Sequence, residues 1–254
     1  MFLAVDLGNT SVVFAFFEGN DIVCDYRMKT DSKMTPDDYC VKLSLYLESK
    51  HINPELIRDI LVSSVVPSLN EAIVFVCETL FHIKPLFIGP GVPSGIRVNT
   101  DNPKEVGGDL IADCAGAKAL FNEPCLIVDL GTATKLIVMG KDGAFEGCCI
   151  APGVAISLSA LVGNAALLGD VDIKIPSKTL GKNTGDSISS ALTYGTAYSI
   201  KGLADALEKE VGYPLKRVLT GGYARILGPL LPDYHYEPNL TLIGIKAIFE
   251  RNHR

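Results

Sequence analysis

Hydrophobic and polar positions along the chain follow two successive copies of one pattern. The first copy begins with β-branched and aromatic runs at residues 2–17 and 22–28, separated by turns that contain glycine, which predicts three antiparallel strands. The second copy opens in the same way at residues 126–139 and continues in a strand through Cys149 and Ile150. The repeat predicts two similar α/β halves.

Helical segments follow each set of strands. Thr35 and Pro36 are suited to the N-cap and first position of a helix that runs through Leu47, and two aspartates follow in its first turn. Periodicity predicts further helices over residues 69–81, 107–121, 154–161, 187–211 and 240–251, and further strands over residues 60–66, 85–88 and 217–219. Ligands of α/β folds usually lie in a crevice, so we predict a cleft between the halves.

Composition favours a protein that handles small molecules. Of the 254 residues, 48 % are apolar and 20 % are charged, and the formal net charge is −6. Such an acidic chain has no overall basic face for nucleic acid or anionic lipid. The uncharged run from Gly147 to Gly169 has the length of a membrane span, but its proline and glycines favour a buried loop followed by a core helix. We therefore predict no nucleic-acid and no membrane partner.

The cysteines and the N-terminal residues indicate the cellular compartment in which the protein works. Seven cysteines lie within apolar runs, without the CxxC spacing of zinc or redox sites, which favours buried, reduced thiols. The first residues, MFLAVDLGNT, include an aspartate and lack the basic and continuous apolar regions of a secretion signal. Both observations predict a cytoplasmic protein.

One short motif, VDLG, occurs twice, 123 residues apart, in AVDLGNTSVV at residues 4–13 and IVDLGTATKL at residues 127–136. Each copy lies where a predicted strand turns, and such a turn presents main-chain N–H groups and hydroxyls to phosphate while glycine permits close approach. Asp6 and Asp129 would repel a polyphosphate unless a cation lies between, so we interpret them as ligands of Mg²⁺ or a monovalent ion, directly or through water. The alternative is that each aspartate only initiates a turn.

A third turn with glycines, TGGYA at residues 220–224, follows the predicted strand at residues 217–219. Gly221 and Gly222 are suited to packing main chain against a flat adenine or against ribose. Two glycines are common in strand-to-helix turns, so this turn is informative only together with the two VDLG turns. The three turns together predict binding of an adenine nucleotide.

These turns and the segments between them resemble the type III pantothenate kinases, within the superfamily of acetate and sugar kinases, Hsp70 and actin. The resemblance runs nearly from end to end, through VDLGNTSVVFAFFEG, MKTDSKMTPDDY, VSSVVPSLN, IGPGVPSGIRVNTDNPKEVGGD, VDLGTAT, IAPGVAISLSAL, GKNT, TGG and PNLTLIGIKAIFERN. It implies duplicated ribonuclease H-like (actin-like ATPase) domains, each a mixed five-stranded sheet flanked by helices, with an interdomain cleft. We predict N-terminal and C-terminal subdomains at residues 1–117 and 118–254.

The resemblance also implies an activity, the ATP-dependent phosphorylation of pantothenate to 4'-phosphopantothenate in the first step of coenzyme A biosynthesis. It implies Mg²⁺, a monovalent cation (K⁺ or NH₄⁺), and a homodimer whose acceptor site lies at the subunit interface. The long predicted helix at residues 187–211 is our candidate contact, because Gly195 and Gly202 permit close helix approach and Tyr194 and Tyr198 lie beside them.

Roles of individual residues follow from the same resemblance. ATP binding is assigned to Asp6, Leu7, Gly8, Asn9, Thr10, Ser11, Val12, Val13 and Thr132, together with Gly221 and Gly222. Substrate binding is assigned to Gly107, Gly108, Asp109, Leu110 and Thr184. Asp109 corresponds to the catalytic carboxylate that accepts the hydroxyl proton of the substrate, and Asp129 to the ligand of the monovalent cation, whereas the Mg²⁺ role of Asp6 follows from the charge argument given above.

Asp109 lies in the first turn of a predicted helix, where the helix dipole stabilises an ionised carboxylate and makes it a weak base. A loose phosphoryl-transfer transition state needs little proton removal until late, so positioning and charge neutralisation should supply most of the rate. The alternative is a simple charge at a helix N-terminus.

Four positions depart from the family pattern. Leu110 stands where arginine is usual, Thr100 where an aromatic residue is usual, and Lys135 and Ile137 where threonine and aspartate are usual. Leucine cannot supply the bidentate bonds with which arginine binds a carboxylate. A Lys135 ammonium near Asp129 could replace the monovalent cation, and the alternative is an exposed strand lysine. These departures leave two alternative functions open. The protein could be a nucleotide-binding paralogue with altered acceptor specificity or reduced catalysis, or it could be a regulatory accessory factor. A sugar kinase of the same superfamily would need a longer chain.

Overall fold

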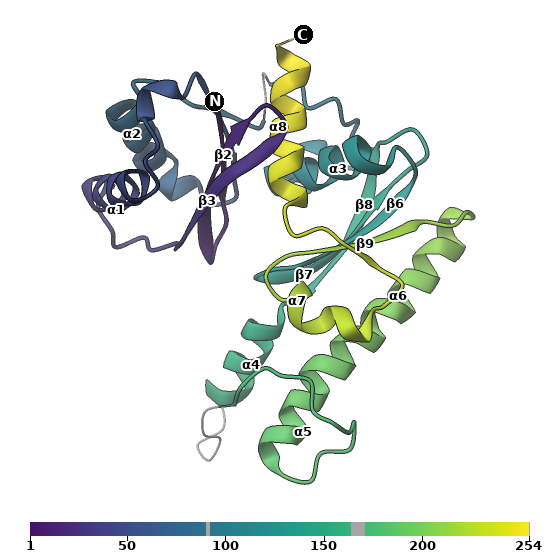
Figure 1. The fold of residues 1–254 in the computed structure, drawn as a ribbon. Coiled ribbons are helices and arrows are strands. Elements are labelled where there is room, and N and C mark those ends of the chain that lie inside the picture. Colours follow the sequence, from purple (N-terminus) through teal and green to yellow (C-terminus); the bar gives the residue numbers. More distant parts are fainter. Residues whose placement is uncertain (90–91, 164–170, 254) are drawn as a thin grey trace. The chain divides into compact units, whose positions relative to one another are not determined.

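The computed structural model describes residues 1–89, 92–163 and 171–253 (Figure 1). By its internal contacts the chain divides into two compact units, one of residues 1–96, 102–120 and 240–254 and the other of residues 97–101 and 121–239. The C-terminal helix α8 (Leu240–Asn252) packs on strands of the first unit and completes it. The subdomain division at residues 1–117 and 118–254 stays a prediction, and packing groups the residues differently because the last helix returns to the first unit.

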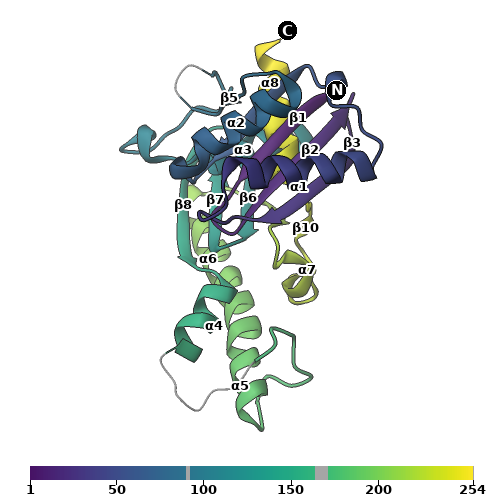
Figure 2. The same ribbon diagram turned by 90° about the vertical axis from the view of Figure 1, so that its left-hand side faces the viewer.

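The first unit contains a five-stranded mixed sheet in the order β3-β2-β1-β4-β5 (Figure 2). Its strands are β1 (Phe2–Leu7), β2 (Ser11–Glu18), β3 (Asp21–Lys29), β4 (Asp59–Ser64) and β5 (Leu86–Phe87). β1 is antiparallel to β2 and parallel to β4, and β2 is antiparallel to β3. The meander predicted over residues 2–28 is therefore confirmed.

Helices cover both faces of this sheet. α1 (Pro36–Ser49) and α2 (Asn70–Phe81) pack on the face that carries Leu3, Val5 and Leu7, in one hydrophobic core. Side chains alternate along a strand, so Phe2 points to the other face, where its ring stacks on Phe249 of α8 at 4.3 Å. α3 (Gly108–Phe121) also lies on this second face.

The start of α1 agrees with the sequence prediction in detail. The Thr35 hydroxyl accepts the Asp38 N–H at 3.2 Å, and the Asp38 carboxylate accepts the Thr35 N–H at 2.8 Å. This reciprocal capping satisfies two main-chain donors that the first helical turn leaves without intrahelical partners. Pro36 occupies the first turn, as predicted.

The second unit repeats the topology of the first. Its sheet has the order β8-β7-β6-β9-β10, and β6 is antiparallel to β7 and parallel to β9. The strands are β6 (Cys125–Leu130), β7 (Ala133–Met139), β8 (Phe145–Pro152), β9 (Lys216–Thr220) and β10 (His235–Tyr236). Two sheets with the same strand order confirm the predicted duplicated ribonuclease H-like, actin-like ATPase fold; the interdomain cleft stays a prediction.

The helices of the second unit are α4 (Val154–Gly163), α5 (Thr184–Ser190), a π-helical segment (Ala191–Gly195), α6 (Thr196–Val211) and α7 (Ala224–Leu227). The long helix predicted over residues 187–211 is confirmed, although it begins earlier and widens to π-helical pitch in the middle. The short elements α7 and β10 were not predicted. Short 3₁₀ turns occur at Pro54–Leu56, Pro67–Leu69, Pro103–Glu105 and Gly228–Leu230.

The prediction of a core helix after Gly147 is wrong for the described residues. Of α4, only Val154 is buried, while Ile156 and Leu161 are 44 % and 45 % exposed. An uncharged, apolar sequence indicates burial against some partner but does not say that the partner belongs to the same fold. The end of the predicted run, residues 164–170, lies outside the described residues.

The prediction that the cysteines are buried, reduced thiols agrees with the structure only in part. None of the seven cysteines is paired in a disulfide, and Cys40, Cys77, Cys114 and Cys125 are buried, but Cys148 is exposed on β8, an edge strand of its sheet. Across the part of the chain that the structure describes, none of the helices combines the length and apolar character needed to cross a bilayer.

Candidate functional site

The first glycine turn joins β1 to β2 and is braced from β3. The Gly8 N–H donates to the Ser11 carbonyl at 3.0 Å, and a Cβ at Gly8 would lie 3.1 Å from the same oxygen. The Thr30 hydroxyl donates to the Gly8 carbonyl at 2.6 Å, and the Thr30 N–H donates to the Thr10 carbonyl at 3.0 Å. Asn9 and Thr10 are exposed at the tip of this fixed turn. The sequence analysis does not predict a role for Thr30, because its hydrogen bond to the Gly8 carbonyl is seen only in the folded sheet.

Asp6 lies at the end of β1, on the sheet face that α3 covers. It is in register with Ser63 of the parallel strand β4, and in-register residues of parallel strands point to the same face. Ser63 is fully buried. It lies beneath the start of α3, since a Cβ built on Gly108 would lie 3.5 Å from the Ser63 Oγ. Asp6 and the helix that begins with Gly108 and Asp109 therefore meet at one edge of one sheet. Ser63 was not predicted, because strand periodicity alone does not show which helix covers a position.

Asp109 occupies the first turn of α3 and is partly buried. Its Oδ1 accepts the Leu110 N–H at 2.9 Å, and a Cβ at Gly107 would lie 2.5 Å from that oxygen. Glycine at position 107 thus permits this orientation of the carboxylate. The Leu110 side chain is buried, so the position where arginine is usual contributes to packing.

Several residues predicted to bind ATP have side chains that face the protein interior. Leu7 and Val12 belong to the core beneath α1 and α2, and Val13 is 1 % exposed. Only their main-chain groups could contact a nucleotide. Ser11 is partly exposed and its hydroxyl accepts a hydrogen bond from Arg27 at 3.2 Å.

The second glycine turn joins β6 to β7. The Gly131 N–H donates to the Ala133 carbonyl at 3.1 Å, as the Gly8 N–H does in the first turn. The Gly153 N–H donates to the Thr132 carbonyl at 3.1 Å, and a Cβ at Gly153 would lie 2.2 Å from that oxygen. Gly153 was not predicted, although a glycine after proline at the start of a helix is a local signal of close packing.

The third glycine turn contacts the second one. Gly221 has φ +91°, and a Cβ there would lie 2.5 Å from Asp129 Oδ1 and 2.6 Å from main-chain atoms of Leu130. The Tyr223 N–H donates to the Leu130 carbonyl at 3.0 Å. The structure therefore brings together the predicted residues of β6 and of the TGG turn. No atom among the described residues lies within 4 Å of a Cβ built on Gly222, so this glycine borders open space.

Lys135 pairs with Asp129 across the second turn. Its Nζ donates to Asp129 Oδ2 at 2.6 Å, and the two side chains are 17 % and 14 % exposed. The two residues are opposite each other in the antiparallel pair of β6 and β7. The alternative of an exposed strand lysine is therefore wrong, and the ammonium neutralises the carboxylate beside the glycines.

The remaining predicted positions lie elsewhere. Thr184 is exposed and begins α5, where the Asn183 side chain accepts the Asp186 N–H at 2.8 Å. Figures 1 and 2 show α5 at the end of the long helical run that leads away from the sheet of its own unit. Ile137 is fully buried in β7, and Thr100 lies in the segment that belongs to the second unit.

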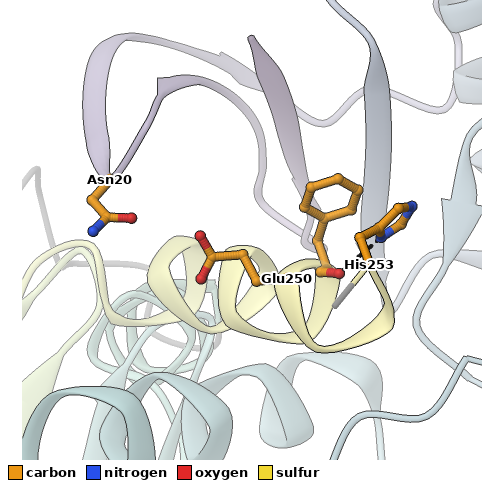
Figure 3. A pocket seen from close by; sticks show the side chains of 4 residues that line it. Asn20, Glu250 and His253 are labelled. Atoms are coloured by element: carbon orange, nitrogen blue, oxygen red, sulfur yellow. Dashed lines mark hydrogen bonds between the residues drawn. The ribbon is translucent and has the colours of Figure 1, made fainter.

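An open pocket of about 410 Å³ lies on the first unit, lined by Asn20, Phe249, Glu250 and His253 (Figure 3). Asn20 follows β2 at the end opposite to Ser11, so the pocket lies at the sheet end away from the first glycine turn. The largely buried Lys246 donates to the Asn20 side chain at 3.1 Å and pairs with Glu250. These groups satisfy one another, and the pocket contains none of the residues predicted for catalysis.

A magnesium site of protein ligands alone is not present in the described ranges, where no three His, Cys, Asp or Glu side chains gather. Mg²⁺ usually keeps several waters and takes one or two carboxylates together with substrate phosphates. Asp6, a single carboxylate beside an exposed glycine turn, fits that donor set.

Comparison with known proteins gives consistent matches over the chain. A family model described as type III pantothenate kinase matches residues 2–206. The type III pantothenate kinase of Acholeplasma laidlawii is 41 % identical over 254 residues, covering 99 % of both chains, and that of Myxococcus xanthus is 36 % identical, covering 100 % of this chain and 99 % of the relative. Component A of the (R)-2-hydroxyglutaryl-CoA dehydratase of Acidaminococcus fermentans has a TM-score of 0.60 at 15 % identity, covering 100 % of this chain and 99 % of that one, which shows the fold alone.

Proposed function

The chain belongs to the type III pantothenate kinase family, and on that premise we propose how its residues phosphorylate pantothenate with ATP in coenzyme A biosynthesis. The observation that carries the proposal is the arrangement within the first unit. Asp109 lies in the first turn of α3, at the sheet edge where Asp6 lies near the end of β1 and the braced turn exposes Asn9 and Thr10. A carboxylate for the acceptor and donors for phosphate thus lie on neighbouring elements.

The glycine turns are proposed to hold ATP. Asn9 and Thr10 would donate to phosphate oxygens from a turn that Thr30 fixes in advance, so little reorganisation is needed on binding. Thr132, Gly221 and the exposed main chain at Gly222 are proposed as further nucleotide contacts. Asp6 would hold Mg²⁺ through its hydration shell, and the ion neutralises charge on the phosphates when bound.

Asp109 is proposed to orient the primary hydroxyl of pantothenate and to accept its proton late in the transfer. Its carboxylate is held by the Leu110 N–H and by close contact with Gly107, which restricts its rotation. Because Leu110 is buried, the pantothenate carboxylate must be bound by other residues. The same observation favours a second candidate, a kinase of this fold for a different hydroxyl-bearing acceptor.

A homodimer is proposed to complete the acceptor site, with Thr184 of one subunit serving the site of the other. Thr184 is exposed and begins α5, at the end of a helical run that leads away from the sheet of its own unit. On the same run Tyr198 is 58 % exposed, and a Cβ on Gly195 or Gly202 would meet no atom of the described residues within 4 Å. These features leave room for a partner helix. A cytoplasmic location is proposed as well, supported by cysteines that are not paired in disulfides.

Lys135 is proposed to act as a built-in cation at the second turn. The family resemblance places a monovalent cation at Asp129, and here an ammonium already pairs with this carboxylate at 2.6 Å. Turnover should therefore not depend on K⁺ or NH₄⁺.

The test is a coupled assay of ADP release with ATP and pantothenate, with 4'-phosphopantothenate identified by mass spectrometry. Asp109→Asn should lower kcat roughly 100-fold or more with ATP binding retained, whereas Asp101→Asn, at an exposed aspartate, should leave kcat unchanged. Absence of product at millimolar pantothenate, with ATP binding intact, would reject pantothenate as acceptor and favour the second candidate.

A further inference from the structure

The helix that carries Asp109 is in direct main-chain contact with the C-terminal helix. Along α3, helical spacing places on one stripe Asp109, Ala112, Asp113 and Gly116. A Cβ at Gly116 would lie 2.3 Å from the Leu240 carbonyl oxygen, and a Cβ at Gly244 would lie 1.7 Å from the Ala112 carbonyl oxygen. The stripe that begins with Asp109 therefore continues into a crossing with α8 that only glycines permit.

A buried hydrogen bond fixes this crossing. The Thr241 hydroxyl donates to Asp113 Oδ1 at 2.6 Å, across 128 residues of sequence. Asp113 is 1 % exposed and lies one helical turn after Asp109. A carboxylate is costly to bury unless it is hydrogen-bonded, and the first turn of a helix, here that of α8, favours negative charge. The bond is directional, so it specifies how α3 is rotated and translated against α8.

We propose that Asp113 and Thr241 are positioning residues for Asp109, a role that rests on the function proposed above. The glycine contacts bring the two helices together but supply no directional hydrogen bond, so by themselves they leave α3 some freedom to shift against α8. The Thr241–Asp113 bond removes that freedom one turn from the carboxylate that meets the acceptor hydroxyl. The C-terminal segment of the chain thus sets the geometry of the acceptor site in the first unit.

The experiment compares three variants of the full chain. Thr241→Val removes the hydroxyl at nearly constant volume, and Thr241→Ser keeps it. Thr35→Val is the matched control, because it also removes one hydroxyl of the first unit, the one that accepts the Asp38 N–H at 3.2 Å and caps α1 on the opposite face of the sheet. Steady-state kinetics are measured below the lowest Tm, together with hydrogen exchange of the α3 amides.

Thr241→Val should lower kcat about tenfold with the KM for ATP within about twofold of the wild type, because small displacements of reacting groups cost large factors in rate. Exchange at the first α3 amides should rise, and Thr241→Ser should restore both readouts. Thr35→Val should lower Tm without changing kcat. The inference is overturned if Thr241→Val keeps wild-type kcat and α3 exchange while Tm falls as in the control. Failure of the proposed function is distinct, since the wild-type enzyme would then form no phosphopantothenate while the exchange difference remained.

Discussion

Removing the charge of Lys135 is the most direct test of how the second glycine turn tolerates its carboxylate. Lys135→Met keeps the apolar stem of the side chain and deletes the ammonium that donates to Asp129 Oδ2 at 2.6 Å. The carboxylate stays beside Gly221, at 14 % exposure, with this positive partner removed. ATP would then bring a second negative group to the same turn.

The magnitude follows from the partial burial of the pair. Removing one partner of a buried ion pair costs about 3 to 5 kcal/mol, and exposed pairs contribute about 0 to 1 kcal/mol. With 17 % and 14 % exposure this pair lies nearer the buried limit, so we expect roughly 2 to 3 kcal/mol. If the cost falls on ATP binding, the KM for ATP rises roughly 30- to 150-fold, since about 1.4 kcal/mol is a factor of ten.

The assay measures initial rates against ATP concentration in a buffer free of K⁺ and NH₄⁺, and again with either ion added. Wild-type rates should be the same in both buffers. Lys135→Met should show the raised KM without the ions and recover with them, because a free cation can then approach Asp129. In the double variant Asp129→Asn/Lys135→Met the uncompensated charge is gone, so the KM should lie closer to the wild-type value than in Lys135→Met.

Two results would refute this reasoning. A strong K⁺ requirement of the wild-type enzyme would show that the Lys135 ammonium does not supply the cation function. A Lys135→Met enzyme with unchanged KM in ion-free buffer would show that the charge of Asp129 does not act on the nucleotide.

Three further predictions concern local structure. Gly221→Ala forces a Cβ into contact with Asp129 at a positive φ, so Tm should fall and the Kd for ATP, measured by calorimetry, should rise; an unchanged Kd would contradict this placement of the turn. Thr35→Ala removes the α1 cap and should lower the free energy of unfolding by about 1 kcal/mol in urea, with kcat unaltered. Burial raises the pKa of the Cys77 thiol to about 12, which keeps it protonated at neutral pH, so maleimide should label the exposed Cys148 and spare Cys77 in the native protein, as peptide mass mapping would show.

Much of the fold was predictable because its determinants are local. The alternation of apolar residues around Gly8 and Gly131 defines two hairpins, and the cap at Thr35 defines a helix start. The position of α8 was not predictable, because an amphipathic pattern shows that a helix has a buried face without naming its partner. The same limit explains α4, whose apolar residues are largely exposed in the described chain.

The candidate site was predictable where the spacing of residues along the sequence determines which side chains meet. Lys135 falls near Asp129 as soon as the hairpin register is drawn, and the ion pair agrees with that reasoning. Thr30 was missed because it lies after the end of the predicted third strand, and Ser63 because it lies on a parallel strand whose neighbour the sequence does not specify. The burial of Leu110 was also hidden, since a leucine in the first turn of a helix reads equally well as a surface or a core residue.

The two copies of the turn treat their carboxylates differently, and the register shows how. Val13 stands opposite Asp6, whereas Lys135 stands opposite Asp129 at the equivalent cross-strand position. Val13 carries no charge and forms no ion pair with Asp6, which agrees with the role proposed above for Asp6 as a ligand of Mg²⁺. At the second turn, the Lys135 ammonium pairs with the Asp129 carboxylate and cancels its charge. The duplicated fold thus places a cross-strand ammonium at the second turn and an apolar residue at the equivalent position of the first turn, and the asymmetry arises from a single strand position.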